Sequence, residues 1–345
     1  MNKILSVIRY KYSLNQLFNY AKYKLSKKKE TLNYRPIWTI LYLSDLCNLK
    51  CKMCPHHAKN DNDFEFQKKL GKKFISLELV TKIYEKFPET ILVMLGGVGE
   101  PTLHPKFKEI VELTAKNRKK INLITNGTLL TDDIMEYIVK EKYFNQISVS
   151  LNASNESEYQ KISDVDKSYF YVVVNNIKKL VELKRKYNSK IEIVVSGVCS
   201  KEFVNSSYDF LKFCDSLGVD RIDLHRYIDF DIHDSLTDID EFSDDILKIH
   251  QFASKNIKTR CNLPHQITKT SYKKGCDWFF KNISFDSYGN IGSCGRVISP
   301  DSSYGNIEDD EDIWNNKYMQ KMRRDFIEKD VVTKYCKKCI ENHQS

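Results

Sequence analysis

Three cysteines near the amino terminus constrain this 345-residue chain more than any other feature. Cys47, Cys51 and Cys54 have the spacing C-x3-C-x2-C, and no fourth cysteine follows closely in the sequence. In an electron-transfer [4Fe–4S] cluster, a cysteine thiolate binds each of the four irons. Three closely spaced thiolates therefore predict a cluster with one iron open to a ligand that is not protein. An open coordination position of this kind is typical of a catalytic metal site.

A second set of cysteines lies in the carboxyl-terminal part of the chain. Its members are Cys276, Cys294, Cys336 and Cys339. The last two form a Cys-Lys-Lys-Cys motif, which is short enough to bind neighbouring positions of one metal centre. Four thiolates complete the coordination of a cluster, so this set predicts a closed site. The sequence thus offers one three-cysteine site and one four-cysteine site.

Composition and hydropathy favour a cytoplasmic globular protein. Hydrophobic residues make up 41% of the chain and charged residues 29%, which is ordinary for such a protein. No apolar run approaches the roughly 20 residues that span a bilayer, and the first residues do not read as a signal peptide. Thiols stay reduced in the cytoplasm, so ten cysteines indicate metal binding rather than disulfides.

The net charge of +9 is concentrated at the amino terminus. Residues 1–37 contain nine Lys or Arg and one Glu, a balance of +8, which leaves about +1 for the rest. A nucleic-acid groove is therefore not expected. Residues 1–36 read as a basic amphipathic segment with helical spacing of its apolar residues. Two interpretations stay open: a helix packed on the body of the protein, or peripheral docking on an anionic membrane surface or a lipid-linked substrate.

Strand and helix patterns alternate along the following two hundred residues. Predicted strands are 38–43, 91–95, 120–125, 146–151, 191–195 and 221–225, and predicted helices are 74–86, 105–117, 132–142, 171–187 and 205–217. Short apolar strands that alternate with helices indicate parallel strands joined by crossover helices. Six strands of this kind could form an open doubly wound sheet or an incomplete barrel. Both architectures place the ligand site at the carboxyl ends of the strands.

Small and polar residues follow three of these strands. The second predicted strand ends in Gly96-Gly-Val-Gly-Glu-Pro101, the third in Thr125-Asn126-Gly127 and the fourth in Ser150-Leu151-Asn152. Glycine lets a backbone approach a ligand closely. Each of these motifs alone is more often a turn or a helix cap. Their shared position at the strand ends favours a binding role.

Taken in order, the cysteine motif, the glycine turn and the Thr-Asn-Gly motif resemble the radical S-adenosylmethionine (radical SAM) superfamily. The resemblance implies a partial (β/α)6 TIM-like barrel of the α/β class. It implies that Cys47, Cys51 and Cys54 hold a [4Fe–4S] cluster whose open iron chelates SAM, with an electron supplied by a flavodoxin- or ferredoxin-type donor. The SAM-binding residues that it implies are Gly97, Gly99, Glu100, Thr125, Asn126, Ser150 and Asn152.

The carboxyl-terminal cysteines resemble those of a SPASM/twitch extension, in which they hold an auxiliary [4Fe–4S] cluster. Between them lies Gly305-Asn306-Ile307 followed by Ile313-Trp314. Four cysteines suit the shorter twitch form with one cluster, and their spacing is similar to that of a butirosin-pathway dehydrogenase. The expected organisation is a basic segment (1–36), a radical SAM core (37–235), a linker (236–260) and an auxiliary cluster domain (261–345).

Oxidation of an alcohol on a carbohydrate or cyclitol is the reaction we expect first, with an unidentified small molecule or glycan precursor as substrate. His225 and Arg226, at the end of the sixth strand, are candidate substrate contacts. Epimerisation is an alternative, for which the thiol of Cys199 could donate a hydrogen atom. Peptide maturation is less expected, because only 46 residues precede Cys47 and leave no room for a peptide-recognition domain.

Two interpretations without radical chemistry also stay open. A non-catalytic electron carrier or redox sensor would use the clusters but would need neither the glycine turn nor the polar strand ends. A zinc knuckle formed by Cys51, Cys54 and His56 or His57 would leave Cys47 unused. His56 and His57 are otherwise expected to be solvated loop residues, and Cys214 and Cys261 to be structural.

Overall fold

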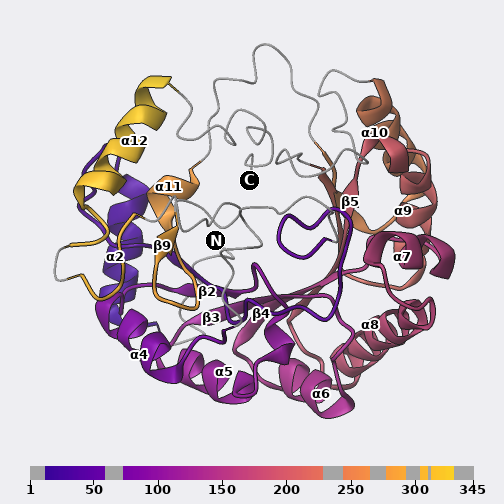
Figure 1. The fold of residues 1–345 in the computed structure, drawn as a ribbon, viewed down its shortest axis with the longest axis horizontal. Coiled ribbons are helices and arrows are strands. Elements are labelled where there is room, and N and C mark those ends of the chain that lie inside the picture. Colours follow the sequence, from indigo (N-terminus) through magenta and orange to yellow (C-terminus); the bar gives the residue numbers. More distant parts are fainter. Residues whose placement is uncertain are drawn as a thin grey trace. The chain divides into compact units, whose positions relative to one another are not determined.

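A computed structural model describes residues 12–58, 73–227, 244–264, 277–292, 304–309 and 312–329 (Figure 1). The chain divides into two compact units, each assembled from separated stretches of sequence. The first contains residues 1–46, 71–123 and 277–334, and the second contains residues 47–70, 124–276 and 335–345.

In the first unit, a sheet combines amino-terminal and carboxyl-terminal strands. Its strands are β1 (Trp38–Leu41), β2 (Leu92–Leu95), β3 (Lys120–Thr125), β8 (Asn282–Phe285) and β9 (Ile291–Gly292), in the order β9-β8-β1-β2-β3. β1 pairs in parallel with both β2 and β8, and Trp38 lies opposite Asn282. A hairpin joins the last two of these strands: β8 and β9 are antiparallel, and Gly289 takes the positive φ of +83° that the turn requires.

The first unit also contains helices. They are α2 (Leu14–Leu25), α4 (Leu77–Lys86), α5 (Phe107–Lys116), α11 (Trp278–Lys281) and α12 (Lys317–Lys329), with a short 3-10 helix η1 (Pro101–Leu103). The hydroxyl of Ser76 caps α4 by accepting a hydrogen bond from the backbone N–H of Leu79 at 3.1 Å. Val80, Ile83 and Tyr84 form its buried face.

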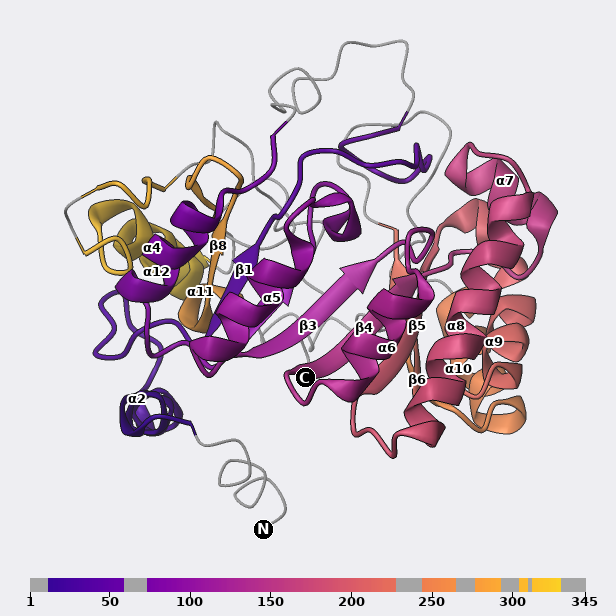
Figure 2. The same ribbon diagram turned by 90° about the horizontal axis from the view of Figure 1, so that it is seen from below.

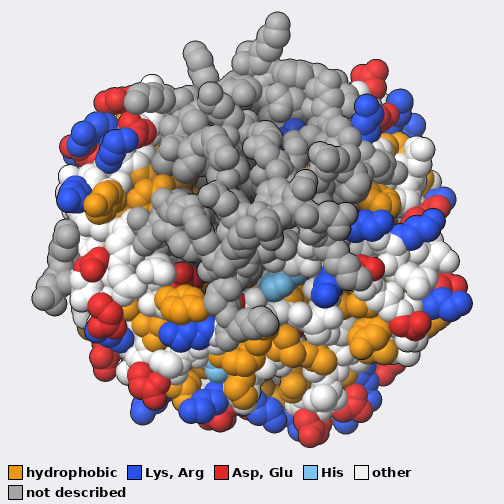
Figure 3. All heavy atoms as spheres, in the orientation of Figure 1, with side chains coloured by type: hydrophobic (Ala, Val, Ile, Leu, Met, Phe, Trp, Pro, Cys, Tyr) orange, Lys and Arg blue, Asp and Glu red, His pale blue; other side chains and the backbone are white. Residues whose placement is uncertain are grey.

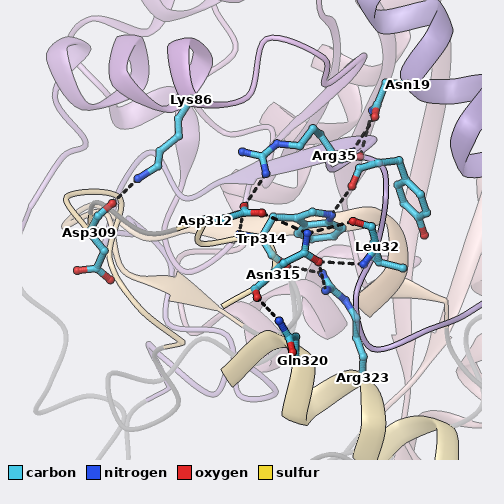
Figure 4. A network of polar contacts seen from close by, with 11 residues as sticks. Asn19, Leu32, Arg35, Lys86, Asp309, Asp312, Trp314, Asn315, Gln320 and Arg323 are labelled. Atoms are coloured by element: carbon cyan, nitrogen blue, oxygen red, sulfur yellow. Dashed lines mark hydrogen bonds and ion pairs between the residues drawn. The ribbon is translucent and has the colours of Figure 1, made fainter. Parts of the chain in front are cut away.

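A polar network ties the carboxyl-terminal segment to the amino-terminal one (Figure 4). The indole Nε1 of Trp314 donates to the carbonyl of Tyr34 at 2.8 Å, and Arg35 forms an ion pair with Asp312 at 2.5 Å. Arg323, which is fully buried, donates to the carbonyls of Phe279, Glu30 and Trp314. The Ile-Trp motif therefore has a structural role, because Trp314 joins the carboxyl-terminal segment to the residues just before β1.

The second unit is a parallel sheet of four strands in the order β4-β5-β6-β7. These strands are β4 (Phe144–Ser150), β5 (Glu192–Cys199), β6 (Arg221–Arg226) and β7 (Arg260–Asn262). Its helices are α6 (Asp132–Lys140), α7 (Glu156–Ser163), α8 (Ser168–Lys186), α9 (Ser206–Ser216) and α10 (Asp244–Asn256), with a 3-10 helix η2 (Lys201–Phe203).

The α/β class and the six predicted strands are confirmed. The elements that were not expected include α7 and, within residues 244–262, α10 and β7. Much of the predicted linker 236–260 is therefore helix and strand, and β7 pairs with β6. The outer domain boundaries stay a prediction. Within the described part of the chain, no helix is both long enough and apolar enough to cross a bilayer.

Candidate active site around the cysteine loop

The cysteine loop turns back on itself through its own backbone. The N–H of Cys54 donates to the carbonyl of Cys51 at 2.8 Å, and the N–H of Ala58 donates to the carbonyl of Cys54 at 3.3 Å. This turn directs the backbone N–H of His56 toward the Cys54 sulfur, at 3.4 Å. Hydrogen bonds to sulfur are among the features by which proteins stabilise thiolate-bound clusters and set their reduction potentials.

Helix α7 holds the loop on both sides of Cys51. The N–H of Lys50 donates to the carbonyl of Ser163 at 3.2 Å, and that of Lys52 donates to the carbonyl of Ile162 at 2.8 Å. Both carbonyls lie in the last turn of α7, where a helix has no internal partners for them. Asn155 starts this helix by capping the N–H of Glu158, and Asp164 ends it in the left-handed conformation. The unexpected helix is thus part of the site's support.

Asn126 connects the end of β3 to the same loop. Its amide nitrogen donates to Oδ1 of Asn48 at 2.8 Å and lies 4.0 Å from the Cys47 sulfur. Its amide oxygen accepts from the backbone N–H and the hydroxyl of Thr128, at 2.9 and 2.7 Å. Asn48 closes the triangle by donating to the Thr128 hydroxyl at 2.8 Å. Asn126 therefore positions the loop.

The three cysteines are half-buried and suit a cluster better than a single metal ion. Burial raises the pKa of the Cys51 thiol to about 12, and the neighbouring Cys54 and Cys47 add to this effect. Among the described residues, no three His, Cys, Asp or Glu side chains converge tightly enough to hold one ion. Half-buried thiols with N–H donors beside their sulfurs fit an iron–sulfur cluster, whose irons stand apart.

His56 and His57 are half-buried rather than solvated. Burial, followed by the proximity of His57, lowers the pKa of His56 to about 4, so its ring is neutral. The backbone N–H groups of both residues face the Cys54 sulfur.

The glycine turn packs against the segment that leads into the cysteine loop. The N–H of Gly99 donates to the carbonyl of Ser44 at 2.9 Å, and that of Glu100 donates to the carbonyl of Leu46 at 2.8 Å. A Cβ atom on Gly99 would lie 2.2 and 2.4 Å from the Leu46 and Ser44 oxygens, so only glycine fits. Gly97 takes a φ of +119°. These N–H groups are already used, so a ligand here would meet carbonyl oxygens.

Glu100 caps the short helix that follows the turn. One oxygen of its buried carboxylate accepts from the backbone N–H of Thr102 at 3.1 Å and from its hydroxyl at 2.6 Å. Asp45, just before the cysteine loop, accepts from the hydroxyl of Ser287 at 2.8 Å, and burial raises its pKa to about 6. The hairpin of β8 and β9 therefore supports the same segment.

Polar side chains line one face of the second unit's sheet. Register places Ser150 of β4 opposite Ser196 of β5, and their hydroxyls lie 3.4 Å apart. Ser196 in turn lies opposite Asp223. The carboxylate of Asp223 accepts two hydrogen bonds from the Arg221 guanidinium, at 2.7 and 3.0 Å. The other face is packed on α9, because a Cβ on Gly197 would meet the Phe210 ring at 2.7 Å. The polar face is thus the one turned away from α9.

The predicted substrate residues divide between these faces. His225 pairs with Val198 in the β5–β6 register and shares its face with Ser196, because side chains alternate along a strand. Arg226 pairs with Cys199 on the helix face, where the Cys199 sulfur lies 3.0 Å from the Ser207 hydroxyl of α9. Cys199 has no exposed surface, and burial raises its pKa to about 11. This location gives the hydrogen-donor role no support.

The chain bends sharply at Asn152, just after the end of β4. The N–H groups of Leu151 and Asn152 both donate to the carbonyl of Ser196, at 3.0 and 3.3 Å, and Asn152 takes a φ of +60°. Asparagine tolerates this left-handed conformation better than most residues.

The hydroxyl of Thr125, the last residue of β3, accepts a hydrogen bond from the N–H of Gly127 at 3.0 Å. The auxiliary cysteines Cys276, Cys294, Cys336 and Cys339 lie outside the described residues.

Sequence reasoning missed the residues that support the loop: Asn48, Thr128, Tyr159 and Ser163. Tyr159 is buried, and its pKa is raised first by burial and then by Cys51. The run Ser154-Asn-Glu-Ser-Glu158 carried the one available signal, since Asn before two acidic residues is typical of a helix start.

Comparison with known families decides the assignment. Residues 41–205 match the Radical SAM superfamily, and residues 276–340 match SPASM, an iron–sulfur cluster-binding domain. The chain therefore carries a radical SAM domain followed by a SPASM domain. All three cysteines of the first set lie in the first match, and all four of the second set lie in the second. Its cofactors are therefore SAM and [4Fe–4S] clusters, and the described thiols fit the first of these clusters.

Two groups of curated proteins are similar to this radical SAM chain in sequence. A tungsten-containing aldehyde ferredoxin oxidoreductase cofactor-modifying protein of Pyrococcus furiosus is 30% identical over 186 residues, which is 52% of this chain. That match spans 48% of the relative, about half of its length. A probable GTP 3',8-cyclase of Saccharolobus islandicus is 26% identical over 230 residues, covering 64% of this chain and 69% of the cyclase.

Solved structures share the fold at low sequence identity. SuiB of Streptococcus suis, bound to S-adenosylmethionine, matches 90% of this chain and 72% of its own with a TM-score of 0.67 and 18% identity. The structure of anSMEcpe with bound AdoMet and Cp18Cys peptide matches 88% of this chain and 86% of its own, with a TM-score of 0.60 and 17% identity. These likenesses confirm the partial-barrel α/β fold.

Proposed function

We propose that this radical SAM enzyme cleaves SAM reductively to methionine and a 5′-deoxyadenosyl radical, which takes a hydrogen atom from a polar substrate. The observation that carries the proposal is the cysteine loop, where three thiols gather under N–H donors and the ends of α7 and β3 hold the backbone. An electron carrier would need the thiols, but it would not need a glycine turn packed against the segment that leads into them.

The chain's own residues have separable tasks in this proposal. When bound, the first cluster supplies SAM with an electron, and the auxiliary cluster accepts one. Cys47, Cys51 and Cys54 hold the first cluster, and the turn at Gly97 and Gly99 offers carbonyl oxygens, which suit the ammonium group of SAM. Ser150 and Asn152, at the end of β4, offer a hydroxyl and an amide to the ribose.

Oxidation of an alcohol on a carbohydrate or cyclitol remains the reaction that we propose first. Its support is the polar face of the second unit's sheet, where Ser150, Ser196 and Asp223 stand in place of an apolar core. His225 shares that face and is the proposed substrate contact. Such a surface suits a substrate that carries many hydroxyl groups.

A peptide substrate is the second candidate, because solved structures with a similar fold include SuiB bound to precursor peptide SuiA. In both cases the 5′-deoxyadenosyl radical removes one hydrogen atom. If the substrate is an alcohol, the resulting carbon radical loses one electron to an oxidant of the iron–sulfur class. Its hydroxyl group loses a proton to a base, and the product is a ketone.

Anaerobic reconstitution tests the proposal. About eight irons per chain are expected, the content of two cubes, together with conversion of SAM to 5′-deoxyadenosine by a chemical reductant. Cys47→Ala should abolish this conversion, whereas Cys214→Ala, which changes a buried cysteine of α9, should not. Intact SAM with a fully loaded protein would refute the enzymatic proposal.

Deuterated substrates then separate the two candidates. Deuterium transfer to 5′-deoxyadenosine from a ring-deuterated cyclitol would support alcohol oxidation. Transfer only from peptides deuterated at their side chains would support maturation instead.

A further inference from the structure

Helix α2 is turned the opposite way from an ordinary surface helix. Its polar residues Gln16 and Asn19 are only 1% and 5% exposed, whereas Leu14, Phe18 and Leu25 are 84%, 64% and 86% exposed. An amphipathic helix normally buries its apolar stripe against the protein. Here the apolar stripe faces outward.

The buried polar residues specify this orientation. The amide nitrogen of Gln16 donates to the carbonyls of Thr90 and Arg118, at 3.0 and 3.2 Å, while its oxygen accepts from the N–H of Ser13 at 2.9 Å. Asn19 donates to the carbonyl of Arg35 at 3.0 Å and accepts from its N–H at 2.7 Å, a pair seen in Figure 4. Rotating the helix to bury its leucines would break these bonds and leave buried carbonyls without donors, which is costly.

The outward residues form one continuous stripe. Leu14, Phe18, Ala21 and Leu25 stand at positions i, i+4, i+7 and i+11, which lie on the same side of an α-helix. All four are exposed. We call them the α2 stripe.

Positive charge surrounds the α2 stripe. Lys22, Lys24, Lys27, Lys28 and Lys29 lie on or just after the helix, and no acidic residue occurs from residue 12 to residue 29. Lys22 reaches over the Phe18 ring, with its nitrogen 4.6 Å from the centroid. On the face shown in Figure 3, by contrast, acidic and basic side chains are interspersed.

We propose that the α2 stripe docks on the surface of an anionic lipid bilayer. Apolar side chains would enter the boundary between headgroups and acyl chains, and the lysines would meet anionic headgroups. A second copy of the chain is a poorer occupant, because a two-fold contact would place the same lysines against one another. The complementary charge therefore selects a lipid surface over self-association.

The contacts of α2 also fix where this surface lies in the first unit. Thr90 and Arg118 precede β2 and β3, so α2 sits at the amino ends of these strands (Figure 2). The glycine turn follows β2 at its carboxyl end. Docking would leave that turn uncovered, and the proposal is independent of the proposed reaction.

Co-sedimentation with vesicles tests this surface. Full-length protein should sediment with phosphatidylglycerol-containing vesicles and not with pure phosphatidylcholine vesicles, and 0.5 M salt should weaken the binding because screening is strong there. The triple variant Leu14→Ser, Phe18→Ser and Leu25→Ser should lower the bound-to-free ratio at least tenfold. Its far-UV circular dichroism should be unchanged, because these side chains make little contact with the protein.

Matched variants make the result decisive. Tyr171→Ser, Val172→Ser and Leu247→Ser remove three other exposed apolar side chains, from α8 and α10, and should leave vesicle binding intact. Failure to bind anionic vesicles, or equal binding by the α2 variant, would overturn the proposal. So would a dimer in light scattering that the α2 variant converts to a monomer, because the stripe would then be a protein interface.

Discussion

The guanidinium group of Arg323 lies over the indole ring of Trp314, with 4.3 Å between its central carbon and the ring centroid. Both side chains are fully buried, and the guanidinium donates to three backbone carbonyls from separate parts of the first unit (Figure 4). Burial lowers the pKa of Arg323 to about 10, which still leaves it charged at neutral pH. Arg323 therefore fastens the SPASM region to the amino-terminal segment.

Replacing Arg323 should destabilise the first unit strongly. Arg323→Met fills much of the same volume but leaves the carbonyls of Phe279, Glu30 and Trp314 without donors, at about 1–3 kcal/mol for each buried group. The urea midpoint of unfolding should fall accordingly. Arg324→Met is the matched control, because the neighbouring arginine makes only an exposed ion pair with Glu30. Equal midpoints for the two variants would contradict this role.

Gly99→Ala should uncouple the glycine turn from the segment before Cys47. Its Cβ would press on the Leu46 and Ser44 oxygens, which belong to backbone and cannot move aside cheaply. We expect SAM affinity to fall at least tenfold in equilibrium binding to the reconstituted protein. Lys116→Ala, at an exposed position of α5, should bind SAM normally. Normal affinity in the Gly99 variant would show that the turn takes no part in binding.

Asn126→Asp should loosen the cysteine loop while keeping the side-chain shape. The carboxylate cannot donate to Asn48 and would place a negative charge 4.0 Å from the Cys47 sulfur. Iron content after reconstitution should drop, and the spectrum of any remaining reduced cluster should shift. Asn155→Asp is the control, since aspartate caps a helix as well as asparagine does. An unchanged spectrum and iron content would remove the positioning role.

His104 should make the first unit sensitive to mild acid. It accepts from the N–H of Lys106 at Nδ1 and donates from Nε2 to the carbonyl of Ile75, so the folded protein requires its neutral form. Burial lowers its pKa below the usual 6.5. Because the unfolded chain then binds more protons, the stability that this group contributes is present above about pH 6.5 and is lost as the pH falls.

The variant His104→Asn keeps an acceptor for Lys106 and cannot be protonated in this range. Its free energy of unfolding should be lower at pH 8 but should change less between pH 7 and pH 5. Parallel profiles for the two proteins, measured by urea denaturation, would mean that His104 is not the titrating group.

Much of the fold could be predicted because parallel strands and their crossover helices carry strong local signals. β3 is found at its predicted residues, 120–125, and α9 differs from prediction by one residue at each end. Helix α7 escaped prediction because its residues are mostly polar and only Tyr159, Ile162 and Ser163 are buried. The acidic composition around α10 suggested a linker, although Ile246, Ile249 and Ala253 form a buried face.

The cysteines expected to bind the first cluster could be predicted from the sequence, but the residues that hold the cysteine loop in place could not. Spacing reveals Cys47, Cys51 and Cys54, because these three cysteines fall within one short stretch of sequence. The triangle of Asn48, Asn126 and Thr128 joins residues about eighty positions apart, and no local pattern reports such a contact. The same limit applies to α2: periodicity predicted a helix, but only the distant carbonyls of Thr90 and Arg118 determine which side faces outward.

Helix α2 is attached at the amino ends of β2 and β3, and this position affects the route by which a substrate would reach the enzyme. A protein moored by that end would hold the opposite rim, where the glycine turn lies, away from the lipid. Reactants would then arrive by diffusion through water instead of lateral travel within a leaflet. A lipid anchor on the substrate would therefore not help the substrate to reach the glycine turn.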